Sequence, residues 1–482
     1  MNWPPFSNRV GRGLIKTTTI GSSPRRCPTL NLDAMKLRLH LCLISFGFLT
    51  AAFGAEDWKA GLASVKITPE KPVLMYGYAN RVKPFERVGQ DIYAKALVLA
   101  DSSGNRAVMV TTDLGAMPAD FVAPLTQRIT EKTGLTRDQI LLSWAHNHAG
   151  PNLSMKVTPG AGISVADAEN RVAYTQWVID RIVDLVAQAN ARLEPARISQ
   201  GGGMVNFVMN RREFTPRGVI LGVNPRGPVD RSVPVLRIEG SDGKARAVLF
   251  GAACHNTTLG SQNYELCGDY AGFAEHFLEE KHPGLQAMFI MGCGGDANPY
   301  PREGMENTRK HGSTLADEVD RVLTGKLRAI AGPLKVTYGR VDLPLQSLSA
   351  ETLKPLAEKS ANWQMDTARK LLGMLERGEK PLTHHSAPVA VWQFGRDLTF
   401  VALPSEVVVD YVQLVEAAIG HLNLWVAAYC NEGFGYVPSA RVIREGGYET
   451  RGLIAGDGWF APATQDALVG KVAELAKQAG RP

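Results

Sequence analysis

Two histidines stand at the end of an apolar run of the chain. The run reads ILLSWAH, ends at His146, and continues through His148 into Gly-Pro. In a β-strand, residues i and i+2 face the same side, so both imidazoles can project toward one point at the strand's end. Imidazole is a common ligand of zinc. The pattern indicates a metal site, although two solvated or hydrogen-bonded histidines at a turn would give the same spacing.

A second apolar run also ends in a histidine. The segment AVLFGAACHN at 247–256 leads to His255. Two separate strands that each deliver a histidine into a turn are harder to explain by packing than one. A third run, MFIMGCGGDANP at 288–299, has glycines that let the backbone approach a site, followed by Asp296, which could orient a histidine. A tight turn with an aspartate cap would explain Asp296 at least as well.

Two later segments offer oxygen ligands. FVALPSEVV at 400–408 puts Glu406 where a helix should begin, so its carboxylate either interacts with the helix dipole or completes a zinc site rich in nitrogen and oxygen. YCNEGFGYV at 429–437 contains Tyr436, and Tyr448 follows it. Tyrosines in glycine-rich loops are usually packing residues, but a phenol near a metal ion can ligate it or donate a hydrogen bond to an oxyanion.

The elements that must position these residues alternate along the chain. Short apolar runs predict strands over 94–99, 107–112, 140–146, 233–238, 247–254, 287–292, 389–394 and 399–403. Longer amphipathic stretches predict helices over 120–133, 166–192, 272–281, 313–323, 350–377, 407–418 and 463–479. The mixture predicts an α/β or α+β fold of layered sheets and helices. Because no repeat or linker interrupts residues 56–482, we expect one large domain there.

The composition is that of a globular protein with a large core. The chain has 482 residues, of which 45% are hydrophobic and 21% charged, and this excludes a disordered or fibrous chain. The net charge of +6 arises in residues 1–55, which hold seven basic side chains and one acidic one. Residues 56–482 hold 46 of each. The body of the protein therefore has no bulk attraction for nucleic acid, and we expect at most peripheral membrane contact.

The first residues have the layout of a targeting segment. Residues 35–55 carry two basic side chains, then an apolar stretch, then small residues, as in a secretory signal peptide. We expect residues 1–34 to be an upstream-start extension and the protein to be secreted or periplasmic. In such a compartment Cys254 and Cys267 could form a disulfide, and buried free thiols would be equally consistent with the sequence.

Taken in order, the motifs resemble those of the neutral/alkaline (non-lysosomal) ceramidases. The shared pattern is His-x-His-x-Gly-Pro, a strand ending in His, Gly-Asp-x-x-Pro, Pro-x-Glu and Asn-x-x-x-x-Tyr, over about residues 76–449. The resemblance implies a layered α/β sandwich with zinc at the bottom of a pocket. It implies that the zinc ligands are His146, His255, Glu406 and Tyr436.

The resemblance also implies roles around the metal. His148 matches a histidine placed for proton transfer, Tyr448 a tyrosine that stabilises the oxyanion, and Arg211 an arginine of the active-site wall. Glu406 would share in proton handling. The sequence departs from the family at Gly268, which stands where family members have a serine implicated in activity. Because the chain ends at Pro482, we expect no immunoglobulin-like C-terminal domain.

These features predict a zinc-dependent amidase. Three or four protein ligands leave a position for a water whose pKa falls to about 7, and this water attacks the amide carbonyl. The resemblance implies that the substrate is ceramide or a related N-acyl lipid. One alternative is a zinc deacylase of the same fold that acts on a non-sphingolipid N-acyl compound. Another is a catalytically silent exported binding protein.

Overall fold

A large mixed sheet forms the centre of the structure, a computed structural model that describes residues 58–160, 162–359 and 362–481. Its strand order is β12-β10-β9-β6-β1-β3-β4-β5, and β14 pairs with β6. The pairs β4–β5 and β10–β12 are parallel, and the other pairs are antiparallel. The bounds are β1 (Trp58–Lys66), β3 (Tyr93–Asp101), β4 (Arg106–Thr112), β5 (Ile140–Trp144), β6 (Glu194–Met204), β9 (Ser232–Gly240), β10 (Ala245–Ala252), β12 (Gln286–Met291) and β14 (Arg328–Ile330).

A second sheet packs on one face of the first. Its strand order is β15 (Leu334–Pro344), β16 (His384–Phe394), β17 (Leu398–Ala402) and β19 (Leu424–Ala427). Successive side chains of a strand point to opposite faces, so alternate residues of both sheets meet in one apolar layer. That layer contains Trp58, Trp392 and Trp425, all buried. The two inner faces therefore form a core of their own.

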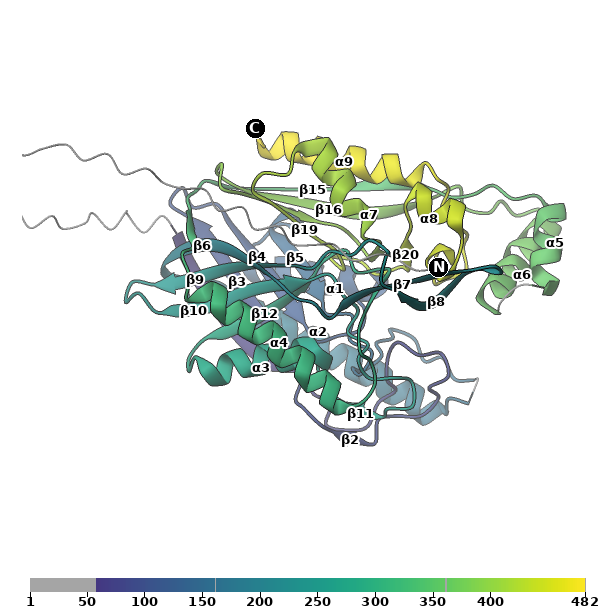
Figure 1. Cartoon of the computed structure of the whole chain (residues 1–482). Coiled ribbons are helices and arrows are strands. Elements are labelled where there is room, and N and C mark those ends of the chain that lie inside the picture. The colour runs from purple at the N-terminus through teal and green to yellow at the C-terminus, as the bar shows by residue number, and fades with distance from the viewer. Residues whose placement is uncertain (1–57, 161, 360–361, 482) are drawn as a thin grey trace, which may run out of the picture. The chain divides into compact units, whose positions relative to one another are not determined.

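Helices cover the outer face of each sheet (Figure 1). Helices α1 to α4 lie on the side of the large sheet, where α2 contacts β1 and β3, and α4 contacts β6 and β9. On the other side, α9 packs on β15 and β16, with α7 beside it. The helices are α1 (Ala119–Thr133), α2 (Val165–Ala191), α3 (Asp269–Lys281), α4 (Met305–Leu323), α5 (Ala350–Lys359), α6 (Asn362–Glu376), α7 (Asp410–Ile419), α8 (Ala440–Glu445) and α9 (Thr464–Ala479). This layering confirms the predicted α/β sandwich.

Short elements connect the layers. One small sheet has the order β13-β7-β8, and two further pairs are β2–β11 and β18–β20. Two 3-10 turns also occur. These elements are β2 (Arg87–Val88), β7 (Val208–Thr215), β8 (Gly218–Asn224), β11 (Glu265–Leu266), β13 (Ala297–Pro299), β18 (Glu406–Val407), β20 (Tyr436–Val437), η1 (Arg137–Gln139) and η2 (Tyr448–Thr450).

Several predicted elements differ from the structure. The helix predicted over 350–377 is two helices, α5 and α6. The helix predicted over 407–418 begins at Asp410, because Glu406 and Val407 extend into β18 instead. Glu406 is thus not a helix-dipole residue. The strand predicted over 140–146 ends at Trp144.

Two further expectations concern the cysteines and the leader. Cys254, Cys267, Cys293 and Cys430 are all buried free thiols in the described part of the chain, so the alternative of a Cys254–Cys267 disulfide is wrong for this structure. The expected extension at 1–34 and signal peptide at 35–55 lie outside the described residues. Within the described ranges, no helix combines the length and apolar character needed to cross a membrane.

Candidate metal centre and active site

The strands that precede the two histidine segments lie far apart in the order of the large sheet, since β5 is one edge and β10 is next to the other edge strand, β12, yet their ends converge. The sheet curls so that β12 contacts β4 and β5. The chain after β19 closes the remaining gap, because Ala428 N donates to Met291 O at 2.9 Å and Asn431 N donates to Leu142 O at 2.7 Å. Beyond the strands, Asn147 and Asn256 form an isolated parallel bridge. The closure brings the loops after β5 and β10 together.

Backbone carbonyls orient two of the imidazoles. His146 Nδ1 lies 2.9 Å from Gly115 O, and His255 Nδ1 lies 2.8 Å from Gly294 O. Each Nδ1 must therefore donate a proton to its carbonyl, which leaves the lone pair on Nε2. Burial, together with the Arg211 guanidinium, lowers the pKa of His255 to about 3, so this ring is neutral at pH 7.

The suggestion that Asp296 orients a histidine is wrong. Its carboxylate accepts hydrogen bonds from Val409 N at 2.8 Å and from Asn210 Nδ2 at 3.3 Å. Asp296 therefore ties the loop after β12 to the start of α7. The carbonyl of Gly294, two residues earlier, orients His255 instead.

A buried carboxylate faces both imidazole lone pairs. Glu406 Oε2 lies 3.1 Å from His146 Nε2 and 3.3 Å from His255 Nε2. The same oxygen is buried and has no hydrogen-bond donor among the described residues. Three acceptor atoms that face one another in a dry site repel, and a cation between them removes the repulsion. The donor set is therefore suited to a metal ion.

The spacing of these atoms fits a small divalent ion. Tyr436 Oη lies 3.3 Å from His255 Nε2. Two ligands of a tetrahedral zinc ion at about 2.1 Å are about 3.4 Å apart, close to the separations seen here. Mixed nitrogen and oxygen donors suit zinc better than magnesium or calcium, which prefer oxygen alone. The structure brings the four expected ligands, His146, His255, Glu406 and Tyr436, to one place.

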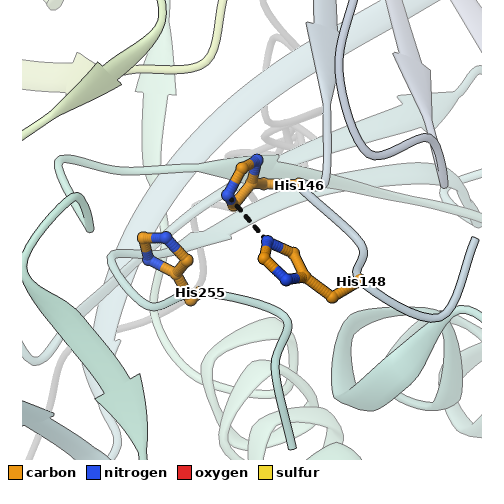
Figure 2. A group of neighbouring side chains, drawn as sticks. All are labelled: His146, His148 and His255. Atoms are coloured by element: carbon orange, nitrogen blue, oxygen red, sulfur yellow. Dashed lines mark hydrogen bonds between the residues drawn. The ribbon is translucent and has the colours of Figure 1, made fainter. Parts of the chain in front are cut away.

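His148 lies close enough to this centre to be a ligand itself. Figure 2 shows the imidazoles of His146, His148 and His255 turned toward one another, and their ligand atoms lie within 4.8 Å. His148 Nε2 is 3.1 Å from His146 Nε2. Burial holds the pKa of His148 well below its usual range, and His148 Nδ1 has no hydrogen-bond partner in the described part of the chain. This buried triad could bind a metal ion.

His146 and His148 both lie past the end of β5. The alternation of side chains along a strand therefore does not explain why their imidazoles face the same point. His146 has a φ of 54°, in the left-handed region that non-glycine residues rarely adopt. Ser405, next to Glu406, and Tyr429 share this conformation at 61° and 54°. Such backbone strain concentrates at functional sites, where the surrounding structure stabilises it.

Arg211 and Tyr448 lie beside the centre. Arg211 Nε donates to Glu449 Oε1 at 2.8 Å, and Arg212 Nη1 donates to Glu449 Oε2 at 2.6 Å. Arg211 Nη1 lies 3.1 Å from His255 Nε2, whereas its Nη2 is buried with no hydrogen-bond partner within the ranges that the structure describes. The Tyr448 ring lies 5.5 Å from the Tyr436 ring. The sequence analysis did not name Arg212 or Glu449, although each directly follows a residue that it did name, Arg211 and Tyr448.

A cavity of about 590 Å³ opens onto the site. His148, Arg211, Tyr436 and Tyr448 all line it. Apolar side chains complete much of its wall, namely Met209, Leu221, Val223, Pro299, Tyr300 and Pro301.

A second cavity, of about 330 Å³, borders the site at Tyr76. The ring of Tyr76 lies 5.8 Å from the His146 ring and 5.6 Å from the His148 ring. The wall of this cavity is mostly apolar and includes Ala116, Leu153, Phe434, Leu453 and Ile454. Tyr76 therefore belongs both to the surroundings of the histidines and to the wall of the second cavity.

Gly268, at the family's serine position, lies outside the walls of both cavities. A Cβ added there would lie 2.6 Å from Gly272 Cα, a backbone contact that no side chain tolerates without a shift. The chain is therefore built around glycine at this position, and a serine here would require a different start of α3.

The architecture and the buried cluster together define the class of protein. Solved structures with the same fold are the crystal structure of neutral ceramidase from Pseudomonas aeruginosa, with a TM-score of 0.68, and a ceramidase complexed with C2, with a TM-score of 0.70. Both are 20% identical to this chain over 88% of its length, which is 75% and 76% of those chains. The fold is thus that of the neutral ceramidases.

The sequence is similar to the same proteins. Residues 58–292, just under half of the chain, match the family described as neutral/alkaline non-lysosomal ceramidase, N-terminal. Neutral ceramidase A of Dictyostelium discoideum is 30% identical over 296 residues, 55% of this chain and 40% of the relative. Neutral ceramidase of Pseudomonas aeruginosa is 25% identical over 255 residues, 51% and 38%. The chain thus spans less than half of these relatives' own length.

Proposed function

We propose that the protein is a zinc-dependent amidase that hydrolyses the N-acyl bond of ceramide, or of a related N-acyl lipid, to a sphingoid base and a fatty acid. One observation carries the proposal: the buried Glu406 Oε2 faces the Nε2 atoms of His146 and His255 beside a cavity. The names of the relatives, and the C2 complex of a protein with the same fold, support this substrate class.

The ligands of the ion would be His146, His255, Glu406 and Tyr436. A bound zinc ion supplies Lewis-acid polarisation of the amide carbonyl and lowers the pKa of a water molecule. Around it, the chain presents hydrogen-bond donors to the cavity. Tyr448 Oη and the unpartnered Arg211 Nη2 are the groups that would stabilise negative charge as it grows on the carbonyl oxygen.

The proton needed by the leaving amine would pass through His148. Its ring is neutral at pH 7 because burial lowers its pKa, so it can accept a proton and return it. The Nε2 atom lies 3.1 Å from His146 Nε2, and the ring also lines the cavity. Glu406 would assist by holding negative charge beside the imidazoles.

The two cavities favour a lipid over a small polar substrate. Ceramide carries two alkyl chains, and burial of each methylene stabilises a complex by about 0.8 kcal/mol. The larger cavity offers Met209, Leu221 and Val223 in its wall, and the second cavity offers Phe434 and Leu453. An N-acyl amino sugar or amino acid would leave much of this apolar surface without contact. A silent binding protein would not need a complete set of metal ligands.

The proposal is tested by an assay of amine release from a fluorescent ceramide. The metal content of the purified protein is measured first. An N-acyl amino acid and N-acetylglucosamine serve as parallel substrates. Amine release from ceramide above the other two is expected. Release from only the small substrates would favour the non-sphingolipid deacylase, and no release by zinc-loaded protein would favour the silent binding protein. We further propose export through residues 35–55, which the mature N-terminus of the expressed protein tests.

A further inference from the structure

Exposed apolar side chains gather on the hairpin of β7 and β8 and on the turn after β13. Phe214, Ile220, Leu221, Val223 and Tyr300 are each between 40% and 59% exposed. Isolated exposed apolar residues are ordinary, but a contiguous group on one protruding element marks a surface that contacts something apolar. In Figure 1 the hairpin extends away from the large sheet.

The hairpin is open on its outer side. In the order β13-β7-β8, strand β8 is an edge strand, and among the described strands it pairs with β7 alone. Such apolar edges are aggregation-prone unless a partner covers them. Ile220 and Leu221 are neighbours in one strand, so they point to opposite faces, and both are about half exposed. A protein partner would cover one face, whereas a lipid phase surrounds both.

The same surface runs into the cavity at the candidate active site. Leu221, Val223 and Tyr300 belong to the cavity wall, while Phe214 and Ile220 lie outside it, nearer the hairpin tip. Exposed apolar side chains therefore occur along the hairpin from near its tip to the wall of the cavity.

Cationic side chains accompany the apolar ones. Arg217 occupies the exposed turn between β7 and β8, and Arg226 follows β8. Neither has an acidic partner within ion-pair distance among the described residues. The nearby Glu213 instead accepts a hydrogen bond from Val223 N at 3.2 Å. Basic side chains beside exposed apolar ones are typical of surfaces that bind anionic lipid.

We infer that the β7–β8 hairpin docks on a bilayer that contains anionic lipid. Phe214 and Ile220 insert among the acyl chains, and Arg217 contacts headgroup phosphates. A lipid leaves the bilayer along Leu221 and Val223 and enters the cavity. The inference goes beyond the proposed amide hydrolysis, since docking requires no turnover.

Co-sedimentation with vesicles tests the inference. The full chain is mixed with vesicles of phosphatidylcholine, alone or with about one third phosphatidylglycerol. The double variant Phe214→Ser/Ile220→Ser should bind at least about tenfold more weakly, because it removes the inserted apolar area. Arg217→Glu should weaken binding only to the anionic vesicles. Leu422→Ser is the matched control, since Leu422 is 71% exposed in the loop between α7 and β19.

Two parallel measurements separate docking from folding and from catalysis. The double variant should keep the wild-type melting temperature and its turnover of a soluble short-chain N-acyl substrate. The inference would be overturned if the double variant bound the vesicles as strongly as the wild type does. A concentration-dependent dimer of the wild type that the double variant does not form would also overturn the inference, because a second copy of the chain would then cover the hairpin. Vesicle binding that depends on Phe214 and Ile220 in a protein that hydrolyses no substrate would sustain docking and refute the proposed function.

Discussion

Glu406 and Tyr436 are directly paired residues of the parallel strands β18 and β20. The pairing fixes the backbone positions of two candidate oxygen ligands relative to each other. Glu406 N also donates to Gly435 O at 3.1 Å, which ties the two segments at the same point. A site preorganised in this way holds its ligands in place before an ion binds.

Replacement of a proposed nitrogen ligand should remove metal and activity together. His255→Ala deletes an imidazole whose Nε2 faces Glu406 and Tyr436. We expect the metal content of the purified protein to fall at least about tenfold, with turnover falling in parallel. Metal analysis measures the first effect. His276→Ala, at an exposed histidine of α3, should change neither, and a fully metallated His255→Ala would remove this residue from the ligand set.

Tyr448 should affect chemistry without affecting metal. Tyr448→Phe removes one hydroxyl donor from the cavity wall and leaves the ring, which packs against Tyr436. Loss of one oxyanion donor costs about a hundredfold or more in turnover. We expect that loss in kcat with unchanged metal content. Tyr93→Phe, on β3, is the control, and wild-type kcat in Tyr448→Phe would refute the proposed role.

The ion pairs behind the site should contribute strongly to stability. Glu449 accepts from both Arg211 and Arg212, and all three side chains are buried. Glu449→Gln leaves two buried guanidinium groups without their shared carboxylate, which should lower the free energy of unfolding by about 3 kcal/mol. Chemical denaturation measures this loss. Glu306→Gln, at an exposed position of α4, should have almost no effect, and equal stabilities for the two variants would contradict the argument.

Asp296 should make stability depend on pH. Burial raises the pKa of Asp296 from 3.8 to about 6. The folded protein therefore binds this proton more tightly than the unfolded chain, and the stabilisation is lost as pH rises from about 4 to about 6, by about 3 kcal/mol. Asp296→Asn has no proton to lose. Urea denaturation across this range measures the free energy of unfolding of both proteins. As pH rises, the wild type should lose that amount of stability relative to Asp296→Asn. A difference that stays constant with pH would show that Asp296 ionises normally.

The residues that the sequence named as candidate ligands lie together in the structure, whereas several elements around them differ from the prediction. Histidines and glutamate after apolar runs marked where strands end, and the resemblance supplied their order, so the four expected ligands were named. The reason for their convergence was not visible in the sequence. The curl of the large sheet and the closure by residues 428–431 depend on backbone pairing between distant segments. The left-handed conformation of His146 likewise depends on its surroundings.

The sequence analysis also did not predict strands β6, β8, β18 and β20, and the reasons are local. Strand β6 contains three consecutive glycines and a proline, so its sequence lacks the alternation typical of a half-buried strand. Strand β8 is apolar but exposed, and a pattern of buried and exposed residues cannot identify it. Strands β18 and β20 have two residues each, too short for any periodicity.

The metal content of purified wild-type protein, compared with that of Glu406→Gln, tests the central claim most directly. The glutamine amide can donate to the imidazole lone pairs that now face a carboxylate, so the variant should fold while losing the ion. We predict about one zinc ion per chain in the wild type and at least about tenfold less in Glu406→Gln. Equal metal content in the two proteins, or no metal in a wild type supplied with zinc, would contradict the account.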